Sequence, residues 1–284
     1  MTENMAFPRA LFAEITKEAP AQPATNLWRA VELMALMDHA LPRLTECRAI
    51  LDLGCGDGGI MAVLSHHIPF KAKLIGIDSD PAETALAEKR GLYVQLITGS
   101  AEKTTLPDAS VDAVISNSVL EHIEPIDDVL RECARVLRPG GAFIATVPGP
   151  HFHQCLCGPW LPWITRARYL RDLDQRLAHL RYWTGKEWQK HLADANIELT
   201  DAKGYLPLPV VRRWELLSRL TGGLLYSLAK QKLSPIRLQR RLGLRKPIPF
   251  PHLLIDSASR LLSYGLDGVP KAPYGCLLLM GLKK

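Results

Sequence analysis

Apolar residues follow two kinds of spacing in the first 150 positions of the chain. Short apolar runs bounded by glycine, proline or acidic residues are typical of buried strands, whereas apolar residues spaced three or four apart are typical of helices. The pattern predicts strands at 49–53, 74–77, 93–97, 111–116 and 142–147, and helices at 27–41, 59–67, 81–90 and 126–137. Because strands and helices alternate, we expect an α/β fold with a parallel sheet and helices on both of its faces.

The pattern changes after Pro148. Residues 159–180 are rich in aromatic residues and arginine and are expected to be helical, and a capping box from Thr184 to Glu187 predicts a helix that ends at Ala195. Further on, we expect a strand at 198–204, amphipathic stretches at 214–228 and 252–264 inside a long insertion, and an apolar strand at 275–282. The second half is therefore expected to add inserted helices to the core.

Composition places the chain among globular proteins with a sizeable core. Of its 284 residues 47% are apolar, and no run of eighteen apolar residues predicts a membrane-spanning helix. The start, which carries Glu3 and Arg9, lacks the apolar stretch of a signal peptide. Six scattered cysteines favour reduced thiols over a disulfide framework, so we expect a cytoplasmic protein.

Charge divides the chain into two unlike halves. Residues 1–147 hold 13 basic and 20 acidic residues, whereas residues 148–284 hold 22 basic and 9 acidic ones. Within residues 206–250 there are ten basic residues and one acid, Glu215. Such asymmetry indicates an acidic partner, an anionic substrate or a membrane surface for the second half.

A glycine-rich turn carries the clearest chemical signal. The apolar run that contains Asp52 breaks into Gly54, Gly56 and Gly59, and a second apolar run ends in Asp78. A strand, a glycine turn that brings backbone N–H groups close to a ligand, and a carboxylate at the next strand tip predict a nucleoside cofactor site. The spacing G-x-G-x-x-G alone would also suit a nicotinamide-dependent dehydrogenase.

Five segments in a fixed order narrow the choice of cofactor. They read LDLGCGDG at 51–58, GID at 76–78, GSAE at 99–102, LPDASVDAV at 106–114 followed by VLEHI at 119–123, and VLRPGG at 136–141. With these segments, about a third of the chain resembles the class I S-adenosylmethionine-dependent methyltransferases of the type 11 kind. The resemblance implies a doubly wound, Rossmann-like α/β fold with a seven-stranded mixed sheet, an antiparallel last strand, a helical N-terminal segment, and helical insertions after the fifth and sixth strands.

The resemblance also divides the chain into six segments. We expect a helical cap at 1–46, a cofactor-binding core at 47–150, a helical substrate insertion at 151–183, a core helix and strand at 184–205, a basic amphipathic lid at 206–272, and a final core strand at 273–284. Insertions between the last two strands form substrate lids in this family, so the acceptor is expected to meet the residues after Pro148.

Cofactor contacts can be assigned residue by residue. Asp52 is expected near the ammonium of the methionyl group, the backbone around Gly54 and Gly56 supplies donors for its carboxylate, and Asp78 accepts both ribose hydroxyls. By resemblance, residues 100–102 flank the adenine and residues 117–119 close over the cofactor. The expected set, for S-adenosyl-L-methionine and its product S-adenosyl-L-homocysteine, is Asp52, Gly54, Cys55, Gly56, Asp78, Ser79, Ser100, Ala101, Glu102, Asn117, Ser118 and Val119.

Histidine and aromatic residues after the core strands are candidates for acceptor chemistry. Methyl transfer to a hydroxyl needs a base, and His151 and His153 follow the fifth strand, at the edge where open α/β sheets bind ligands. We expect one of these two histidines to be catalytic. His122 borders the cofactor in many relatives, and it is expected to line the acceptor site together with Trp160, Tyr182 and Trp183.

Two sequence features bear on a metal. In an extended segment His151, His153, Cys155 and Cys157 would point the same way and could hold Zn²⁺, but a row of ligands wraps an ion poorly, and a loop of half-buried residues is favoured. Ubiquinone-type O-methyltransferases carry an acidic pair and a histidine around 118–122, where this chain has Ser118 in place of the first acid. We therefore expect no obligate metal.

The favoured function is methyl transfer from S-adenosylmethionine to oxygen of a small, largely apolar or lipid-like acceptor. The alternatives are an RNA or N-methyltransferase that uses the basic insertion, and a regulatory protein that binds the cofactor without turnover. Residues 206–250 are expected either to form a lid or to contact an anionic membrane surface, which would make the protein membrane-peripheral. Nucleic acid is the less favoured partner, because no RNA-binding module accompanies the core.

Overall fold

The computed structural model describes residues 4–68, 71–224, 252–270 and 272–284, and these divide into two compact units. Unit 1 gathers Met1–Met34, His151–His179 and Tyr205–Gly275. Unit 2 gathers Ala35–Pro150, Leu180–Gly204 and Cys276–Lys284. Each unit is thus assembled from segments far apart in the sequence, and the expected partition into six consecutive segments stays a prediction.

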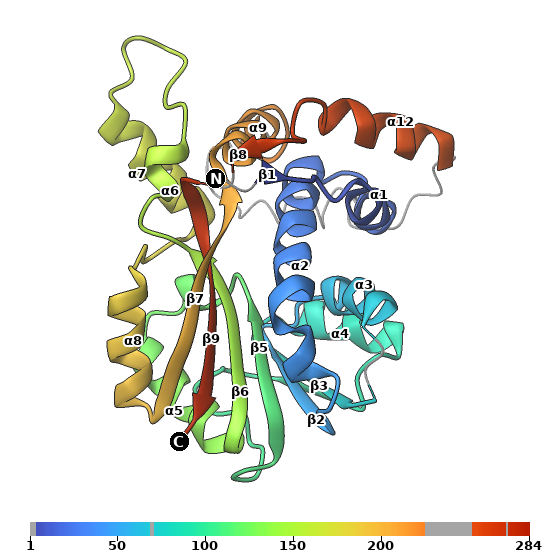
Figure 1. The fold of residues 1–284 in the computed structure, drawn as a ribbon, viewed down its shortest axis with the longest axis vertical. Helices are drawn as coiled ribbons and strands as arrows, with labels where there is room; N and C mark the ends of the chain where they lie inside the picture. Colours follow the sequence, from blue (N-terminus) through green and yellow to red (C-terminus); the bar gives the residue numbers. More distant parts are fainter. Residues whose placement is uncertain (1–3, 69–70, 225–251, 271) are drawn as a thin grey trace. The chain divides into compact units, whose positions relative to one another are not determined.

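A seven-stranded sheet forms the core of unit 2 (Figure 1). Its strands are β2 (Ala49–Leu53), β3 (Lys73–Asp78), β4 (Gln95–Thr98), β5 (Val111–Asn117), β6 (Leu137–Pro148), β7 (Ile197–Pro207) and β9 (Tyr274–Lys283), in the order β4-β3-β2-β5-β6-β9-β7. The strands β4, β3, β2, β5 and β6 are parallel, whereas β9 runs antiparallel to β6. The predicted mixed sheet with an antiparallel last strand is confirmed.

The order of the strands reverses at β2. The chain passes outward from β2 to β3 and β4, and then returns to the other side of β2 to form β5. In open α/β sheets, ligands bind at such a reversal, outside the carboxyl ends of the two strands that flank it. Here those ends are followed by the glycine turn after Leu53 and by the segment after Asn117, both of which the sequence predicts to bind the cofactor.

Helices flank the sheet on both sides, as the alternation of elements predicts. On one side lie α5 (Ile126–Val136) and α8 (Gly185–Asp194), and on the other lie α3 (Gly59–His67) and α4 (Pro81–Arg90) (Figure 1). The Asp80 side chain accepts a hydrogen bond from the Ala82 N–H, and Pro81 opens α4. α8 begins at the predicted capping box between Thr184 and Glu187.

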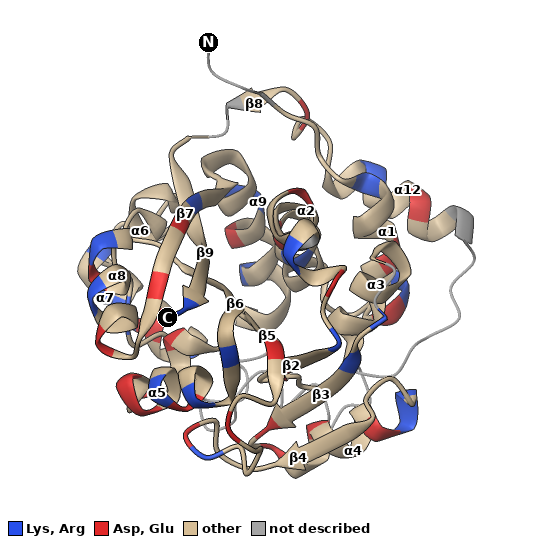
Figure 2. Ribbon diagram, turned by 60° about the horizontal axis from the view of Figure 1, so that its bottom comes forward, with Lys and Arg blue, Asp and Glu red and all other residues tan. Residues whose placement is uncertain are grey.

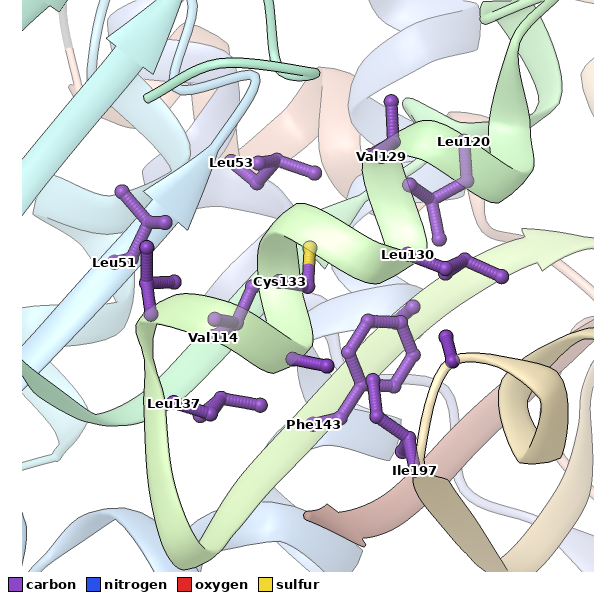
Figure 3. Close-up of a cluster of buried hydrophobic side chains, with 14 of the residues drawn as sticks. Leu51, Leu53, Val114, Leu120, Val129, Leu130, Cys133, Leu137, Phe143 and Ile197 are labelled. Carbon is purple, nitrogen blue, oxygen red and sulfur yellow. The ribbon is translucent and has the colours of Figure 1, made fainter. Parts of the chain in front are cut away.

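The side of the sheet under α5 and α8 holds a continuous apolar cluster (Figure 3). Val129, Leu130 and Cys133 recur at helical spacing on α5 and are completely buried. They share the cluster with Leu51 from β2 and Phe143 from β6. Burial of one large apolar side chain contributes about 1.5–3 kcal/mol, so this layer holds the central strands, and with them the strand tips, in place.

Unit 1 is built mainly from helices. They are α1 (Arg9–Glu18), the first part of α2 (Pro23–Leu44), α6 (Phe152–Cys155), α7 (Arg166–Leu177), α9 (Leu208–Ser218), the π-helical turn η2 (Arg219–Gly223) and α12 (His252–Leu262). The ring of Phe152 lies 5.5 Å from that of Trp28 and 5.6 Å from that of Trp214, so an aromatic cluster joins α6, α2 and α9. A short antiparallel pair, β1 (Asn4–Met5) and β8 (Val269–Pro270), completes the unit.

Several elements differ from the expectation. β4 begins at Gln95, so Tyr93 lies before the strand and not in it. Residues 159–165 precede α7 without joining it, because prolines at 159 and 162 interrupt helical hydrogen bonding. The apolar spacing does not predict α1, although the resemblance implies a helical segment at 1–46, and neither predicts the β1–β8 pair. Of the expected stretch 214–228, residues up to 223 belong to α9 and η2, and residues 225–228 lie outside the described residues.

Charged residues gather on the helices and connecting turns, and the central strands carry few of them (Figure 2). One exception lies at the amino-terminal edge of the sheet, where Asp112 accepts the N–H groups of Arg48 and Ala49 at 2.7 and 2.9 Å and pairs with Arg138. Within the described part of the chain, no helix combines the length and the apolar character that crossing a membrane requires.

Candidate active site

The glycine turn between β2 and α3 lies against Val119, in the segment that follows β5. The N–H groups of Gly54 and Cys55 both donate to the carbonyl of Ile77, at 2.8 and 3.0 Å, which fixes the turn to the tip of β3. Gly54 has a φ of +76°, and a Cβ at this position would lie 2.6 Å from Cγ1 of Val119. The backbone thus comes closer to Val119 than a side chain would permit, which explains the glycine.

Asp78, at the tip of β3, holds the other end of the turn. Its carboxylate accepts the N–H of Gly56 and the N–H of Asp80, each at 2.9 Å. A carboxylate offers about four acceptor positions, so capacity remains for the hydroxyl groups of a sugar. A Cβ on Gly56 would meet nothing closer than Oε2 of the buried Glu83, at 3.9 Å, so the backbone there faces open space. This arrangement fits a nucleoside whose ribose approaches Asp78.

The backbone of the turn has a different role from the one expected. The sequence interpretation has the backbone around Gly54 and Gly56 donate to the methionyl carboxylate, but their N–H groups donate within the protein, to Ile77 and Asp78. The N–H of Cys55 is likewise engaged, and burial, with Asp52 and Asp78 nearby, raises the pKa of its thiol and keeps it protonated. The turn therefore allows a ligand to come close to the backbone, but it does not offer the N–H groups of Gly54 and Gly56 as hydrogen-bond donors to that ligand.

Asp52 is paired with a tyrosine that the sequence pattern does not identify. The hydroxyl of Tyr93 donates to Oδ2 of Asp52 at 2.5 Å. Burial, followed by the charge of Asp52, raises the pKa of Tyr93, so the hydroxyl remains a donor at neutral pH. Gly76 makes room for this pair, because a Cβ there would lie 3.1 Å from the Tyr93 ring and 2.9 Å from the sulfur of Cys55. Asp52 is thus held in one orientation beneath the turn.

The residues after β5 adopt an uncommon backbone conformation beside the glycine turn. Ser118 has a φ of +51°, and its N–H donates to the carbonyl and the hydroxyl oxygen of Thr146, both at 3.0 Å. A positive φ outside glycine is strained, and such strain clusters at functional positions. Asn117 is buried, and Val119 packs on Gly54. The structure thus brings the expected segment 117–119 beside the glycine turn.

The remaining expected cofactor residues lie in the loops after β3 and β4. Ser79 follows Asp78 and is exposed. Ser100 and Glu102 are exposed, Ala101 is half-buried against the apolar cluster, and the Glu102 N–H donates to Oγ of Ser100 at 3.4 Å. Because β3 and β4 run parallel to β2, these loops emerge at the same edge of the sheet as the glycine turn.

A short helix, η1 (Leu120–His122), follows the strained serine and is clamped by the segment that begins at Leu180. The Leu180 N–H donates to the carbonyl of Glu121 at 2.9 Å. The guanidinium of Arg181 donates to the carbonyls of Leu120 and Glu124. No local motif encodes these contacts, so sequence reasoning missed the contribution of Arg181.

Three of the expected acceptor residues, His122, Tyr182 and Trp183, belong to unit 2 and differ from one another in exposure and contacts. His122 is exposed, and its Nε2 lies 3.9 Å from the carboxylate of the buried Glu121. Tyr182 is half-buried. Trp183 stacks on His191 with ring centroids 4.1 Å apart and meets Trp188 edge-on at 4.9 Å. Trp183 therefore contributes to the packing of α8, and its predicted contact with an acceptor stays a prediction.

The two candidate bases lie in unit 1, at the short helix α6. Nε2 of His153 lies 2.8 Å from Oδ1 of Asp174 on α7, an arrangement that orients the imidazole ring. His151 is exposed, and its Nδ1 lies 3.1 Å from the side-chain oxygen of Gln154. The pairing with Asp174 distinguishes His153 as the better candidate.

The segment 151–157 is helical over α6 and not extended. Alternate residues of a helix do not share a face, so the row of side chains considered for Zn²⁺ does not form. Cys155 is buried, whereas Cys157 is exposed and its N–H donates to Glu215 at 2.7 Å. The extended conformation that the less favoured zinc interpretation required is therefore absent from this segment, of which residues 152–155 are helical and not the loop that was favoured.

Two aromatic residues of unit 1 lie against one arginine. The guanidinium of Arg219 lies 4.8 Å from the ring centroid of Trp160 and 4.7 Å from that of Tyr169. Trp160 is 60% exposed and Trp163 is 73% exposed, so neither is a core residue. Trp160 belongs to unit 1 and Trp183 to unit 2, and their shared role at an acceptor site stays a prediction.

Comparison with known proteins finds a family match over part of the chain. The family model for the methyltransferase domain matches residues 51–145. A protein of Mycolicibacterium smegmatis named "Probable S-adenosylmethionine-dependent methyltransferase" is 37% identical over 144 residues, which make up 50% of this chain and 54% of that protein. A ubiquinone biosynthesis O-methyltransferase of Rhizobium etli is 26% identical over 186 residues, which make up 63% of this chain and 71% of that enzyme.

Solved structures share the fold. The crystal structure of an S-adenosylmethionine-dependent methyltransferase from Mesorhizobium loti gives a TM-score of 0.51 at 20% identity, covering 89% of this chain and 96% of that chain. The chain spans about half the length of the mycobacterial relatives that it matches. The family match, the named relatives and the seven-stranded sheet agree. Residues 51–145 therefore match the methyltransferase domain family, and the seven-stranded sheet has the fold of solved S-adenosylmethionine-dependent methyltransferases.

Proposed function

We propose that this chain transfers a methyl group from S-adenosylmethionine to a small-molecule acceptor. The proposal rests on the open space at Gly56, bordered by the carboxylate of Asp78, inside the segment that matches the methyltransferase family. When bound, the cofactor supplies an electrophilic methyl group on a sulfonium centre. The task of the chain is to hold that centre and align an acceptor atom with it.

Each part of the proposed cofactor site has one task. Asp78 accepts the ribose hydroxyls with the acceptor capacity that Gly56 and Asp80 leave. Asp52, held by Tyr93, supplies negative charge for the ammonium group. The turn at 100–102 flanks the adenine, and residues 117–119 close over the cofactor.

For the acceptor we propose an oxygen atom of a small, largely apolar or lipid-like molecule, with His153 as the base. Similarity to a ubiquinone biosynthesis O-methyltransferase, over 71% of that enzyme, supports a hydroxyl acceptor. A hydroxyl must lose its proton as it attacks, and an imidazole held by a carboxylate is suited to take it. His153, at 2.8 Å from Asp174, has this arrangement, whereas the recorded partner of His151 is the amide of Gln154.

The experiment follows radiolabelled methyl from S-adenosylmethionine into phenols and long-chain alcohols, with amines and RNA as separate arms. General base catalysis contributes about 10²–10⁴-fold, so His153→Gln should lower kcat by that factor and change the pH profile. The matched variant His151→Gln should keep nearly full activity. Transfer to amines or RNA alone would contradict an oxygen acceptor, and equal losses in both variants would contradict the choice of base. Cofactor binding without transfer to any acceptor would favour a regulatory protein.

We also propose that residues 206–250 bind an anionic membrane surface. Ten bases and one acid support it, although most of the bases lie outside the described residues. Of the described ones, Arg213 donates to the carbonyls of Leu262 and Tyr264, and Arg219 pairs with Glu215. We expect binding to anionic over neutral liposomes that disappears at high salt. Equally weak binding to both kinds of liposome would leave the lid interpretation.

A further inference from the structure

An open cavity of about 420 Å³ lies within unit 1. It is bounded by residues of the loop at 157–160, by α9, and by the turn after α12 at Gly265 and Leu266. Its volume falls within the roughly 300–1,000 Å³ typical of small-molecule sites. Trp160, an expected acceptor residue, lines it, whereas among the described residues the proposed cofactor contacts and the candidate bases do not.

A buried carboxylate builds one wall of the cavity. Glu215 is only 2% exposed, and it accepts the N–H groups of Cys157 and Gly158 at 2.7 and 3.3 Å and the hydroxyl of Tyr169 at 2.5 Å. Arg219 completes the set and neutralises the charge. Two of these four donors, the N–H groups of Cys157 and Gly158, fix the loop at 157–160 against α9. The cavity therefore has a preformed wall, which lowers the entropic cost of binding a ligand.

The arginines around the cavity are not equivalent. Arg219 is held by Glu215 and the Gly158 carbonyl, and Arg213 donates to the carbonyls that end α12. Arg212 also lines the cavity, but its side chain is exposed, and no hydrogen bond or ion pair joins it to the described residues. Three guanidinium groups against one carboxylate give the cavity a positive charge, and Arg212 has donors available for an incoming anion.

Apolar side chains share the same opening. Trp160 is 60% exposed and Leu216 is 40% exposed, and both line the cavity next to Arg212. Leu208 and Leu266 add further apolar surface. Exposed apolar groups of this size are uncommon away from binding sites when they are contiguous. The cavity thus combines an apolar wall with a guanidinium that makes no hydrogen bond or ion pair to the described residues.

From this combination we propose that the cavity binds an amphiphile with an anionic phosphate or carboxylate group. Arg212 receives the anionic group through its planar fork of N–H donors, which matches both chemistries. The apolar part of the ligand lies on Trp160 and Leu216. The proposal concerns binding within unit 1 and does not require that the bound amphiphile be methylated.

The test uses the full chain and calorimetry with three probes. Dodecyl phosphate, kept below its micellar concentration, carries both features; inorganic phosphate lacks the chain, and dodecyl maltoside lacks the charge. We expect dodecyl phosphate to bind at least about tenfold more tightly than either comparison probe, because charge-assisted contacts and apolar burial each contribute. Arg212→Gln should weaken its binding by about ten- to a hundredfold.

A matched variant controls for the loss of charge. Arg168→Gln removes the same charge from α7 of the same unit, where the side chain is 70% exposed and lies 3.8 Å from Asp172, and it should bind dodecyl phosphate as the wild type does. The proposal is overturned if Arg212→Gln keeps wild-type affinity, if dodecyl maltoside binds equally well, or if inorganic phosphate does. Both variants should retain wild-type affinity for S-adenosyl-L-homocysteine, so failure at this cavity and failure of the methyl-transfer proposal are read separately.

Discussion

Replacement of Gly54 by alanine tests how tightly the glycine turn is packed. A Cβ there would lie 2.6 Å from Cγ1 of Val119 and closer still to Cγ2. The turn cannot easily withdraw, because the N–H groups of Gly54 and Cys55 both donate to the carbonyl of Ile77. In addition, the φ of +76° at this position is unfavourable for alanine.

Two contributions set the size of the effect. The left-handed conformation costs a residue other than glycine roughly 1–2 kcal/mol. Overlap with a well-packed neighbour typically costs about 1–3 kcal/mol. Gly54→Ala should therefore lower the free energy of unfolding by about 2–5 kcal/mol, a large share of the roughly 5–15 kcal/mol by which native proteins are stable.

Two other glycines separate the contributions. Gly91 has a φ of +64°, and a Cβ there meets nothing within 4 Å, so Gly91→Ala should cost the backbone contribution alone. Gly56 has a φ of +54° and open space, so Gly56→Ala should cost a similar amount of stability and also weaken cofactor binding. Urea unfolding measures the stability, and calorimetry with S-adenosyl-L-homocysteine measures the affinity. Adding Val119→Ala to Gly54→Ala should restore part of the loss.

The packing argument is refuted if Gly54→Ala proves no less stable than Gly91→Ala, because the overlap with Val119 would then contribute nothing. It is also refuted if the double variant shows no recovery. An unchanged affinity in Gly56→Ala would count against the cofactor site instead, and would leave the packing argument intact.

Three further predictions concern charged side chains. Asp78→Ala should weaken binding of S-adenosyl-L-homocysteine about ten- to a hundredfold, as expected for lost hydrogen bonds to a charged group; unchanged affinity in calorimetry would contradict the ribose assignment. Burial alone would raise the pKa of Glu132, but hydrogen bonds from Arg135 and Thr104 outweigh it and lower the pKa from 4.5 to about 2. At 1.36 kcal/mol per pKa unit, the lowered pKa of Glu132 stabilises the fold by about 3 kcal/mol at pH values above the unfolded pKa, and this contribution is lost as pH falls through about 2. Glu132→Gln should remove this dependence of the free energy of unfolding on pH, as measured by urea unfolding at a series of pH values. The same dependence on pH in the wild type and the variant would exclude the contribution of Glu132. Arg181→Met should loosen the segment after β5 and weaken S-adenosyl-L-homocysteine binding severalfold, and Arg181→Lys should weaken it less. Arg131→Met, the control at an exposed position, should leave this binding unchanged. Equal effects of Arg181→Met and Arg131→Met would mean that only the loss of positive charge matters.

Local chemistry explains which elements the sequence predicts well. α4 begins and ends where expected because Asp80, Pro81 and Gly91 act on the backbone within a few positions. The capping box of α8 is equally local. By contrast, the pairing of Asn4 with Pro270 joins two-residue strands from distant parts of the chain, and a strand of two residues has no periodicity to detect.

In the candidate site, too, the sequence predicts the features that follow from neighbouring residues and strand ends, but not the contacts that depend on tertiary packing. The tips of β2 and β3 could be predicted because parallel strands bring their carboxyl ends to one edge, which aligns Asp78 with the glycine turn. The bond from Tyr93 to Asp52 spans 41 positions and that from Arg181 to Leu120 spans 61, so both depend on tertiary packing. The direction of the N–H groups in the turn depends on its dihedral angles, which the residue types alone do not specify.

The cysteines of the chain have a practical consequence. Five of the six are buried, and Cys157, which lines the arginine-bearing cavity, is the exposed one. A maleimide dye or spin label needs an accessible thiolate, so it would attach at this position without an engineered residue. Burial, together with Glu215, raises the pKa of the Cys157 thiol, so labelling should be slow at neutral pH and faster in mildly alkaline buffer. The native sequence thus provides its own attachment point for a reporter that would sense the arrival of an amphiphile.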